Sequence, residues 1–244
     1  MLIDDLRCMI AIVLKDLRAY YFKPPNISWG MIFPFAFLLA FVIRNPGDTE
    51  ALVPGLLGLT LLFGTTSMEA IVITFERRIG ALERLLLAPM RLSALLAGKL
   101  LGGVIFGMIT ATVTLGIGAL AFGVETVRWA LLVSAMLMSA AAFSAVGVLV
   151  SVLVNEVFEA QTLANGLRFP MIFLGGVFVP VSALPDPLPV VARFFPLTYG
   201  VEALRFALGG AGSPARSLMD LGVLAAFTVV LFVVAARVLA RRTA

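Results

Sequence analysis

The sequence predicts an all-α membrane protein with six transmembrane helices. Of its 244 residues, 61% are hydrophobic and only 13% are charged, and the mean hydropathy is +1.08, values that no water-soluble globular domain of this length is expected to show. Charged or proline-rich segments also divide the chain into apolar runs long enough to cross a bilayer. The chain is treated as a single transmembrane domain over 1–244, with predicted spans at 27–43, 52–75, 100–122, 129–154, 163–179 and 218–236.

Two residue types that carry much of enzyme and metal chemistry are scarce. The chain has no histidine, which excludes histidine-dependent catalytic triads and histidine metal sites. Its one cysteine, Cys8, has no partner for an internal disulfide. We therefore expect no catalytic residues, no metal site, no cofactor bound by this chain and no nucleic-acid partner. We also expect no cleavable signal peptide, because charges occur throughout residues 1–23.

Residues 1–24 predict a helix that lies in the membrane interface. At helical spacing, one face is apolar and the opposite face is charged. Tyr20 and Tyr21 are expected at headgroup depth, and Pro24-Pro25 is expected to stop the helix. The apolar face comprises Leu2, Leu6, Ile10, Val13, Leu17 and Tyr20, and the charged face comprises Asp4, Arg7, Lys15 and Arg18.

The longest run of charge, residues 76–91, predicts a short surface helix between the second and third spans. A Glu-Arg pair recurs seven positions later, which places Glu76, Arg77, Glu83 and Arg84 on one side of such a helix. Pro89 is expected to end it. The alternative interpretation is a solvated loop whose arginines only fix the membrane topology.

The distribution of arginine and lysine along the chain predicts its orientation across the membrane. They gather in the N-terminal segment, in the 75–99 region and in the C-terminal tail, so the positive-inside rule places both termini and the charged helix in the cytoplasm. The third and fourth spans are also rich in glycine, alanine and serine, and we expect them to pack closely on each other or on neighbouring spans.

Glu69 is an ionisable residue inside the second span, beside Thr65 and Thr66. Because a carboxylate in hydrocarbon is costly, we expect it to face protein or a wet cavity. It then either contacts a translocation path or a proton or cation, or is a hydrogen-bonded packing residue. Phe169 and Phe173 are further candidates for an apolar path. Arg168 is expected to extend toward the inner interface.

Residues 180–212 predict two short helices in the outer leaflet that enter the membrane without crossing it. Neither apolar piece approaches the length of a span, and the helices are expected to separate at Phe195-Pro196. Thr198 is a candidate cap for the second helix. Glu202 and Arg205 are three residues apart on it and can pair. The hairpin candidates are Phe195, Pro196, Tyr199, Glu202 and Arg205.

The order of these elements resembles the ABC-2 type transporter permeases, the membrane subunits of type-2 ABC exporters. The resemblance is carried by the interfacial helix, six spans, the Glu-Arg, Gly, Leu-Glu-Arg-Leu, Pro pattern over 76–89, and the Leu-Pro, Phe-Pro-Leu-Thr-Tyr-Gly and Glu-Ala-Leu-Arg elements before the last span. It implies a permease in the plasma (inner) membrane of a prokaryote that forms a homodimer, or a heterodimer with a second permease, in contact with membrane lipids. It also implies two copies of an ABC ATPase, which would hold ATP and Mg and would meet a coupling helix containing Glu76, Arg77, Arg78, Leu82, Glu83 and Arg84.

The chain itself lacks a nucleotide-binding motif. Its only Gly-Lys pair, Gly98-Lys99, is followed by leucine rather than Ser or Thr. An exporter would therefore hydrolyse ATP on a separate chain. The expected substrate is a hydrophobic small molecule, such as a drug or antibiotic, or a lipid-like molecule. The alternatives are a lipid-linked polysaccharide permease, an ion-coupled carrier or channel using Glu69, and an intramembrane enzyme.

Overall fold

The computed structural model describes residues 2–23, 32, 34–36, 39, 52–88, 90–122 and 127–243. Within these ranges the regular structure is helical. The predicted first span and Pro89 lie outside the described residues, apart from a few isolated positions in 32–39. The elements are α1 (Leu2–Asp16), a π-helical turn η1 (Leu17–Tyr21), α3 (Leu52–Arg78), α4 (Ala81–Leu86), α5 (Leu92–Phe122), α6 (Trp129–Leu153), α7 (Val157–Leu174), η2 (Val181–Ala183), α8 (Leu188–Ala192), α9 (Pro196–Ala207) and α10 (Pro214–Thr243).

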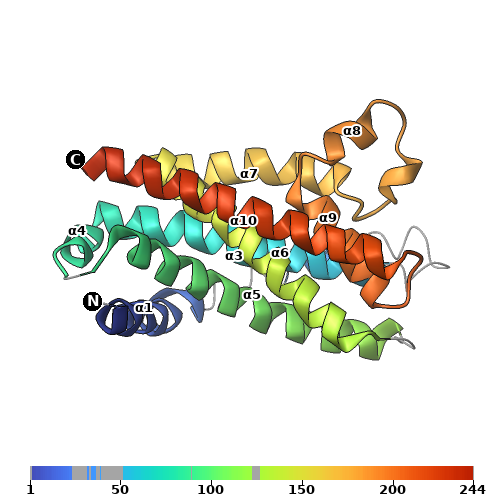
Figure 1. The fold of residues 1–244 in the computed structure, drawn as a ribbon, viewed down its shortest axis with the longest axis horizontal. Helices are drawn as coiled ribbons and strands as arrows, with labels where there is room; N and C mark the ends of the chain where they lie inside the picture. Colours follow the sequence, from blue (N-terminus) through green and yellow to red (C-terminus); the bar gives the residue numbers. More distant parts are fainter. Residues whose placement is uncertain are drawn as a thin grey trace.

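Five long helices, α3, α5, α6, α7 and α10, run lengthwise in one bundle (Figure 1). One end of the bundle, which we call the α4 end, holds α4, α1 and the end of α10, whereas the opposite α9 end holds α8 and α9. In the described part of the chain, four helices are long and apolar enough to cross a membrane: Leu52–Arg78, Leu92–Leu120, Trp129–Leu153 and Pro214–Arg242. The all-helical membrane class is thus confirmed, and the count of six spans stays a prediction.

Helix α3 forms the centre of the bundle. It packs against α5, α6, α7 and α9, and its side chains are buried over almost its whole length. The contacts are close because small residues face α3. A Cβ added to Gly107 would lie 2.4 Å from Thr65 Cγ2, and one added to Gly147 would lie 2.7 Å from the Thr66 carbonyl oxygen. The predicted close packing of the glycine-rich and alanine-rich spans is confirmed.

Several predicted boundaries were wrong at the helix ends. Helix α5 begins at Leu92 rather than near residue 100, and α10 extends beyond 218–236 on both sides. Helix α7 begins at Val157, within what was expected to be a polar loop. The reason is a capping box, in which Glu156 and Glu159 bind the backbone amides of the first turn. Helix α7 also ends earlier than expected, at Leu174, before two glycines of which Gly176 has a φ of +78°.

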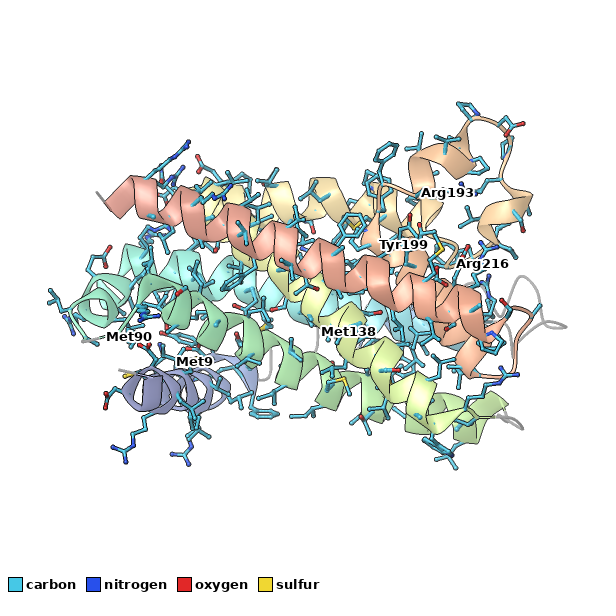
Figure 2. All side chains as sticks on the ribbon, viewed as in Figure 1. Met9, Met90, Met138, Arg193, Tyr199 and Arg216 are labelled. Atoms are coloured by element: carbon cyan, nitrogen blue, oxygen red, sulfur yellow. The ribbon has the colours of Figure 1, made fainter. Side chains whose placement is uncertain are left out.

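The segment after α7 contains two short helices, α8 and α9, that separate at Phe195-Pro196 as predicted. Figure 2 shows Arg193, Tyr199 and Arg216 at this α9 end. Tyr199 donates a hydrogen bond to the Arg193 carbonyl over 2.9 Å. The predicted partners were wrong in two cases. Glu202 pairs with Arg216 at 3.0 Å, while Arg205 donates to the Gly176 carbonyl.

Thr198 is not the cap of α9. Phe195 occupies the capping position, and the Thr198 hydroxyl donates to the Ala192 carbonyl over 2.6 Å. The hydroxyl therefore ties α9 back to α8. Whether this segment enters the outer leaflet stays a prediction.

Candidate functional site: a buried charge cluster beside an exposed helix

Four charged side chains from three elements meet at the α4 end. Lys99 of α5 donates to both oxygens of Asp16 at the end of α1, over 2.8 and 3.1 Å. Lys99 also donates to Glu76 of α3, which accepts a second hydrogen bond from Lys15. Lys15 in turn lies 3.0 Å from Asp16. The side chains of Lys99, Asp16 and Glu76 are fully buried.

The helix ends explain how these residues meet. Glu76 lies in the last turn of α3, whereas Lys99 lies near the start of α5. Since α4 reverses the chain between them, the end of α3 and the start of α5 share one depth in the bundle. Asp16 is the last residue of α1. Because α1 packs on α5, the Asp16 side chain reaches Lys99 and Glu76.

The cluster contains two acids and two bases, so its charges balance. Buried ions lose their hydration, and this cost is offset only where geometry and hydrogen bonding are good. Burial raises the pKa of the Asp16 carboxyl, although the neighbouring Lys99 opposes this shift. Burial lowers the pKa of Lys15, but the hydrogen bond to Glu76 and the charge of Asp16 outweigh it and hold the pKa above its usual value. The cluster therefore joins α1, α3 and α5 through ion pairs, and each buried charge is stabilised by its neighbours of opposite sign.

The predicted continuous helix over 76–91 was wrong. Helix α3 continues to Arg78, the chain turns at Gly80 with a φ of +69°, and the separate helix α4 covers only Ala81–Leu86. A residue with a side chain rarely adopts such a φ, so glycine permits the break. The break turns α4 relative to α3 and separates the two Glu-Arg pairs that the sequence had placed on one face.

The two pairs therefore have different surroundings. Glu76 points inward to the cluster, and Arg77 donates to the Val154 carbonyl over 2.8 Å. Their prediction as part of one surface-facing set was wrong. Glu83, Arg84 and Arg78 are exposed.

Leu82 fixes α4 to the bundle. It is only 2% exposed and belongs to an apolar cluster with Ile73 of α3 and Leu95 and Leu96 of α5. Glu83 and Arg84 are therefore exposed on a short helix whose opposite side packs on α3 and α5, two of the three elements that form the charge cluster. The coupling role of these residues stays a prediction.

The predicted path residues of α3 lie inside the chain. Glu69 is fully buried and accepts a hydrogen bond of 2.6 Å from Tyr21. Thr65 donates to the Leu61 carbonyl, and Thr66 donates to the Phe143 carbonyl. Their assignment to a path stays a prediction, as does that of Phe169 and Phe173, which are 46% and 62% exposed on α7.

Tyr21 and Arg168 are both buried inside the bundle. Tyr21 is fully buried against Glu69, because η1 turns its ring inward toward Phe106, and its position at headgroup depth stays a prediction. Arg168 is 2% exposed and donates to Ser67 of α3 rather than extending to the interface. Both side chains found polar partners inside the bundle.

Sequence reasoning missed Lys15, Asp16 and Lys99 as site residues. One signal was present for Lys99, which is flanked by apolar residues on both sides in the segment 94–106. A lysine in such a segment requires a partner. The partner itself, 83 residues away, has no signal in local spacing.

The fold and the charged end define a multi-helix membrane protein, and comparison with known proteins identifies the family. The ABC-2 type transporter family model matches residues 8–208. The chain belongs to this family.

Three relatives illustrate the similarity. The inner membrane transport permease YadH of Escherichia coli K12 is 23% identical over 188 residues, which cover 76% of this chain and 72% of YadH. The probable doxorubicin resistance ABC transporter permease protein DrrC of Mycobacterium tuberculosis H37Rv is 29% identical over 70% of this chain and 63% of its own length. Nodulation protein J of Rhizobium leguminosarum is 30% identical over 52% of this chain and 50% of its own.

Proposed function

We propose that this chain is the permease subunit of an ATP-driven exporter and that its α4 end receives the work of a separate ABC ATPase. The observation that carries the proposal is the exposure of Glu83 and Arg84 on a helix whose other side is anchored by Leu82. A short charged helix of this kind suits contact with a soluble partner. Membership in the ABC-2 family supports the same assignment.

In this proposal the charge cluster transmits movement. A displacement of α4 by the ATPase is transmitted to α3 through the short turn at Gly80. It is transmitted to α5 through the packing of Leu82. Because Lys99 binds Asp16 and Glu76 together, α1 moves with both helices instead of sliding past them. Rigid elements that shift together are what a two-state transport cycle requires.

The assembly consists of two permease chains, identical or paired with a second permease, and two ATPase chains that hold ATP and Mg. The membrane is the inner membrane of a prokaryote, with the α4 end and both termini in the cytoplasm. The names of YadH as an inner membrane transport permease and of DrrC as a doxorubicin resistance permease support this location and favour a hydrophobic or lipid-like substrate. The proposal assigns no ion site to Glu69: Tyr21 binds one of its carboxylate oxygens, and the other is buried without a hydrogen-bond partner.

The test reverses the two exposed charges of α4. E83R/R84E should weaken binding of the ABC ATPase encoded nearest to this chain by at least about tenfold, since like charges then meet across the contact. Co-purification measures complex formation, and efflux from proteoliposomes with ATP measures transport. Both should fall.

The matched control is D186R/R193D, which reverses an exposed acid and base at the α9 end. It should leave both measurements unchanged. Unchanged binding and unchanged efflux in E83R/R84E would overturn the coupling role. Efflux at the full rate without any ATPase would instead support an ion-coupled carrier.

A further inference from the structure

Arg168 places a positive charge deep in the bundle. It lies eleven residues after Val157, the first residue of α7, which corresponds to about 16 Å along a helix. The predicted span begins at residue 163, five residues before Arg168, and in the described part of the chain α7 is not among the four helices that are long and apolar enough to cross a membrane. The residue is 2% exposed.

The contacts of Arg168 are polar but include no carboxylate. Its Nε donates to the Ala164 carbonyl over 3.2 Å, and Nη1 donates to Ser67 Oγ over 2.6 Å. The guanidinium carbon lies 4.8 Å from the centre of the Phe63 ring. Nη2 is buried without a hydrogen-bond partner.

The predicted spans contain two acidic residues, Glu69 and Asp220. Glu69 accepts a hydrogen bond from Tyr21, and its second carboxylate oxygen is buried without a hydrogen-bond partner. Within the described residues, the ion pairs do not include Arg168. Outside them, the acidic residues are Asp48, Glu50 and Glu125, which fall between the spans predicted from the sequence. A buried charge without an acidic partner is costly and points to a functional partner.

The contacts of Arg168 on α3 lie on a stripe of that helix that becomes exposed toward the α4 end. One stripe of α3 at four-residue spacing becomes progressively less buried toward the α4 end: Phe63 is 8% exposed, Ser67 9% and Phe75 40%, with Ile71 partly exposed between them. The two contacts of Arg168 on α3 belong to this stripe.

Helix α7 can also bend next to Arg168. Pro170 cannot donate a backbone hydrogen bond to the Gly166 carbonyl, so the helix is weakened at this turn. A Cβ added to Gly166 would meet nothing within 4 Å. Phe169, which follows Arg168, and Phe173, five residues after it, are exposed and supply apolar surface.

We infer that Arg168 and Ser67 form a subsite for the acidic group of an amphiphile, a carboxylate or phosphate attached to an apolar body. The inference rests on the proposed export function and specifies its substrate class. The planar guanidinium can direct Nη1 and Nη2 at two oxygens of such a group, and the Ser67 hydroxyl can donate a further hydrogen bond. The bound anion supplies the missing counter-charge, while the apolar body lies along Phe169 and the α3 stripe.

The first experiment measures binding by the full chain alone in phosphatidylcholine nanodiscs. Dodecyl phosphate is titrated by native mass spectrometry, with dodecyltrimethylammonium as the cationic probe and inorganic phosphate as the probe without an apolar chain. R168Q should weaken dodecyl phosphate binding at least tenfold and leave the cationic probe within twofold. R168K keeps the charge but loses the two-pronged guanidinium, so its affinity should lie between that of the unaltered chain and that of R168Q.

Arg128 provides the matched control. Its guanidinium also lies over a phenylalanine ring, at 4.0 Å from that of Phe206, and donates to a backbone carbonyl, but at the α9 end. R128Q should bind dodecyl phosphate within twofold of the unaltered chain. If R168Q does not fold, S67A is the second variant, with an expected threefold loss for the anionic probe only.

Unchanged dodecyl phosphate binding in folded R168Q, or an equal loss for both charged probes, would overturn the subsite. Nanodiscs containing phosphatidylglycerol distinguish the sources of the anion: competition by this lipid supports a bilayer headgroup, and its absence supports a separate amphiphile. The second experiment measures stimulation of the partner ATPase in the complex by dodecyl phosphate. Arg168-dependent binding without any ATPase response supports the subsite and contradicts the export function on which the substrate assignment rests.

Discussion

Lys99 and Arg168 are both buried cations, yet their surroundings differ. Lys99 of α5 meets two carboxylates from two other elements, Asp16 and Glu76. Arg168 of α7 meets a hydroxyl, a carbonyl and an aromatic ring, and one of its nitrogens has no hydrogen-bond partner. The comparison separates a charge that joins helices from a charge that has no acidic partner within the described residues.

The physical difference lies in what remains when each cation is removed. Without Lys99, two buried acids stay close together with only Lys15 to balance them. Without Arg168, no buried carboxylate of the described residues loses its counter-charge. The stability of the chain should therefore depend much more on Lys99.

The largest expected effect is that of K99M. It should lower the free energy of unfolding by about 3–5 kcal/mol, because it leaves buried carboxylates uncompensated. R168M should lower it by about 1 kcal/mol or less, since it removes a charge that has no acidic partner. Denaturant unfolding of the full chain in detergent measures both.

The control for this prediction removes one charge of each sign. K99M/D16N leaves the Lys15–Glu76 pair balanced and should recover at least half of the loss caused by K99M. If R168M costs as much as K99M, the distinction between the two cations is wrong.

An intermediate effect is expected from packing around Glu69. A Cβ added to Gly103 would lie 2.5 Å from Glu69 Oε1 and 2.6 Å from Ser144 Oγ. G103A should therefore cost about 1–3 kcal/mol. G166A, next to Arg168 on α7, meets nothing within 4 Å and should stabilise the helix by up to about 1 kcal/mol. The same unfolding assay compares them, and equal losses would show that α7 is as tightly packed as α5.

The smallest expected effect is that of Y21F. This change removes the 2.6 Å hydrogen bond to Glu69 and should cost about 1–2 kcal/mol, because the acceptor is buried. The control is Y199F, whose hydroxyl donates to a carbonyl in an exposed position and which should cost about 0.5 kcal/mol or less. Thermal unfolding in detergent measures both, and a larger loss for Y199F would contradict this account.

The sequence predicted helical class and several breaks because these depend on local chemistry. Proline fixed the separation of α8 from α9 at Pro196, and small residues predicted the close packing seen at Gly107 and Gly147. Local chemistry could also have predicted the start of α7, which the sequence analysis assigned to a polar loop. Glu156 and Glu159 are three residues apart and form the capping box that starts α7.

The candidate site was only partly predictable. Exposed Glu83 and Arg84 were found because a repeated charge pair stands out in an apolar chain. Glu76 and Arg77 have the same residue types but opposite surroundings, because the turn at Gly80 changes the direction of the helix. A helical wheel assumes one continuous axis, so it cannot detect such a change.

By itself, the sequence determined that this protein is an all-helical membrane protein of a recognisable family, because apolar length, charge content and motif order are properties of the chain. Only the tertiary structure decided that Asp16 pairs with Lys99, that Tyr21 binds Glu69 and that Arg168 has no acidic partner within the described residues. These outcomes depend on how each helix is rotated about its axis and at what depth it meets its neighbours. Many side chains must pack together to set that rotation, and no spacing along the chain encodes it.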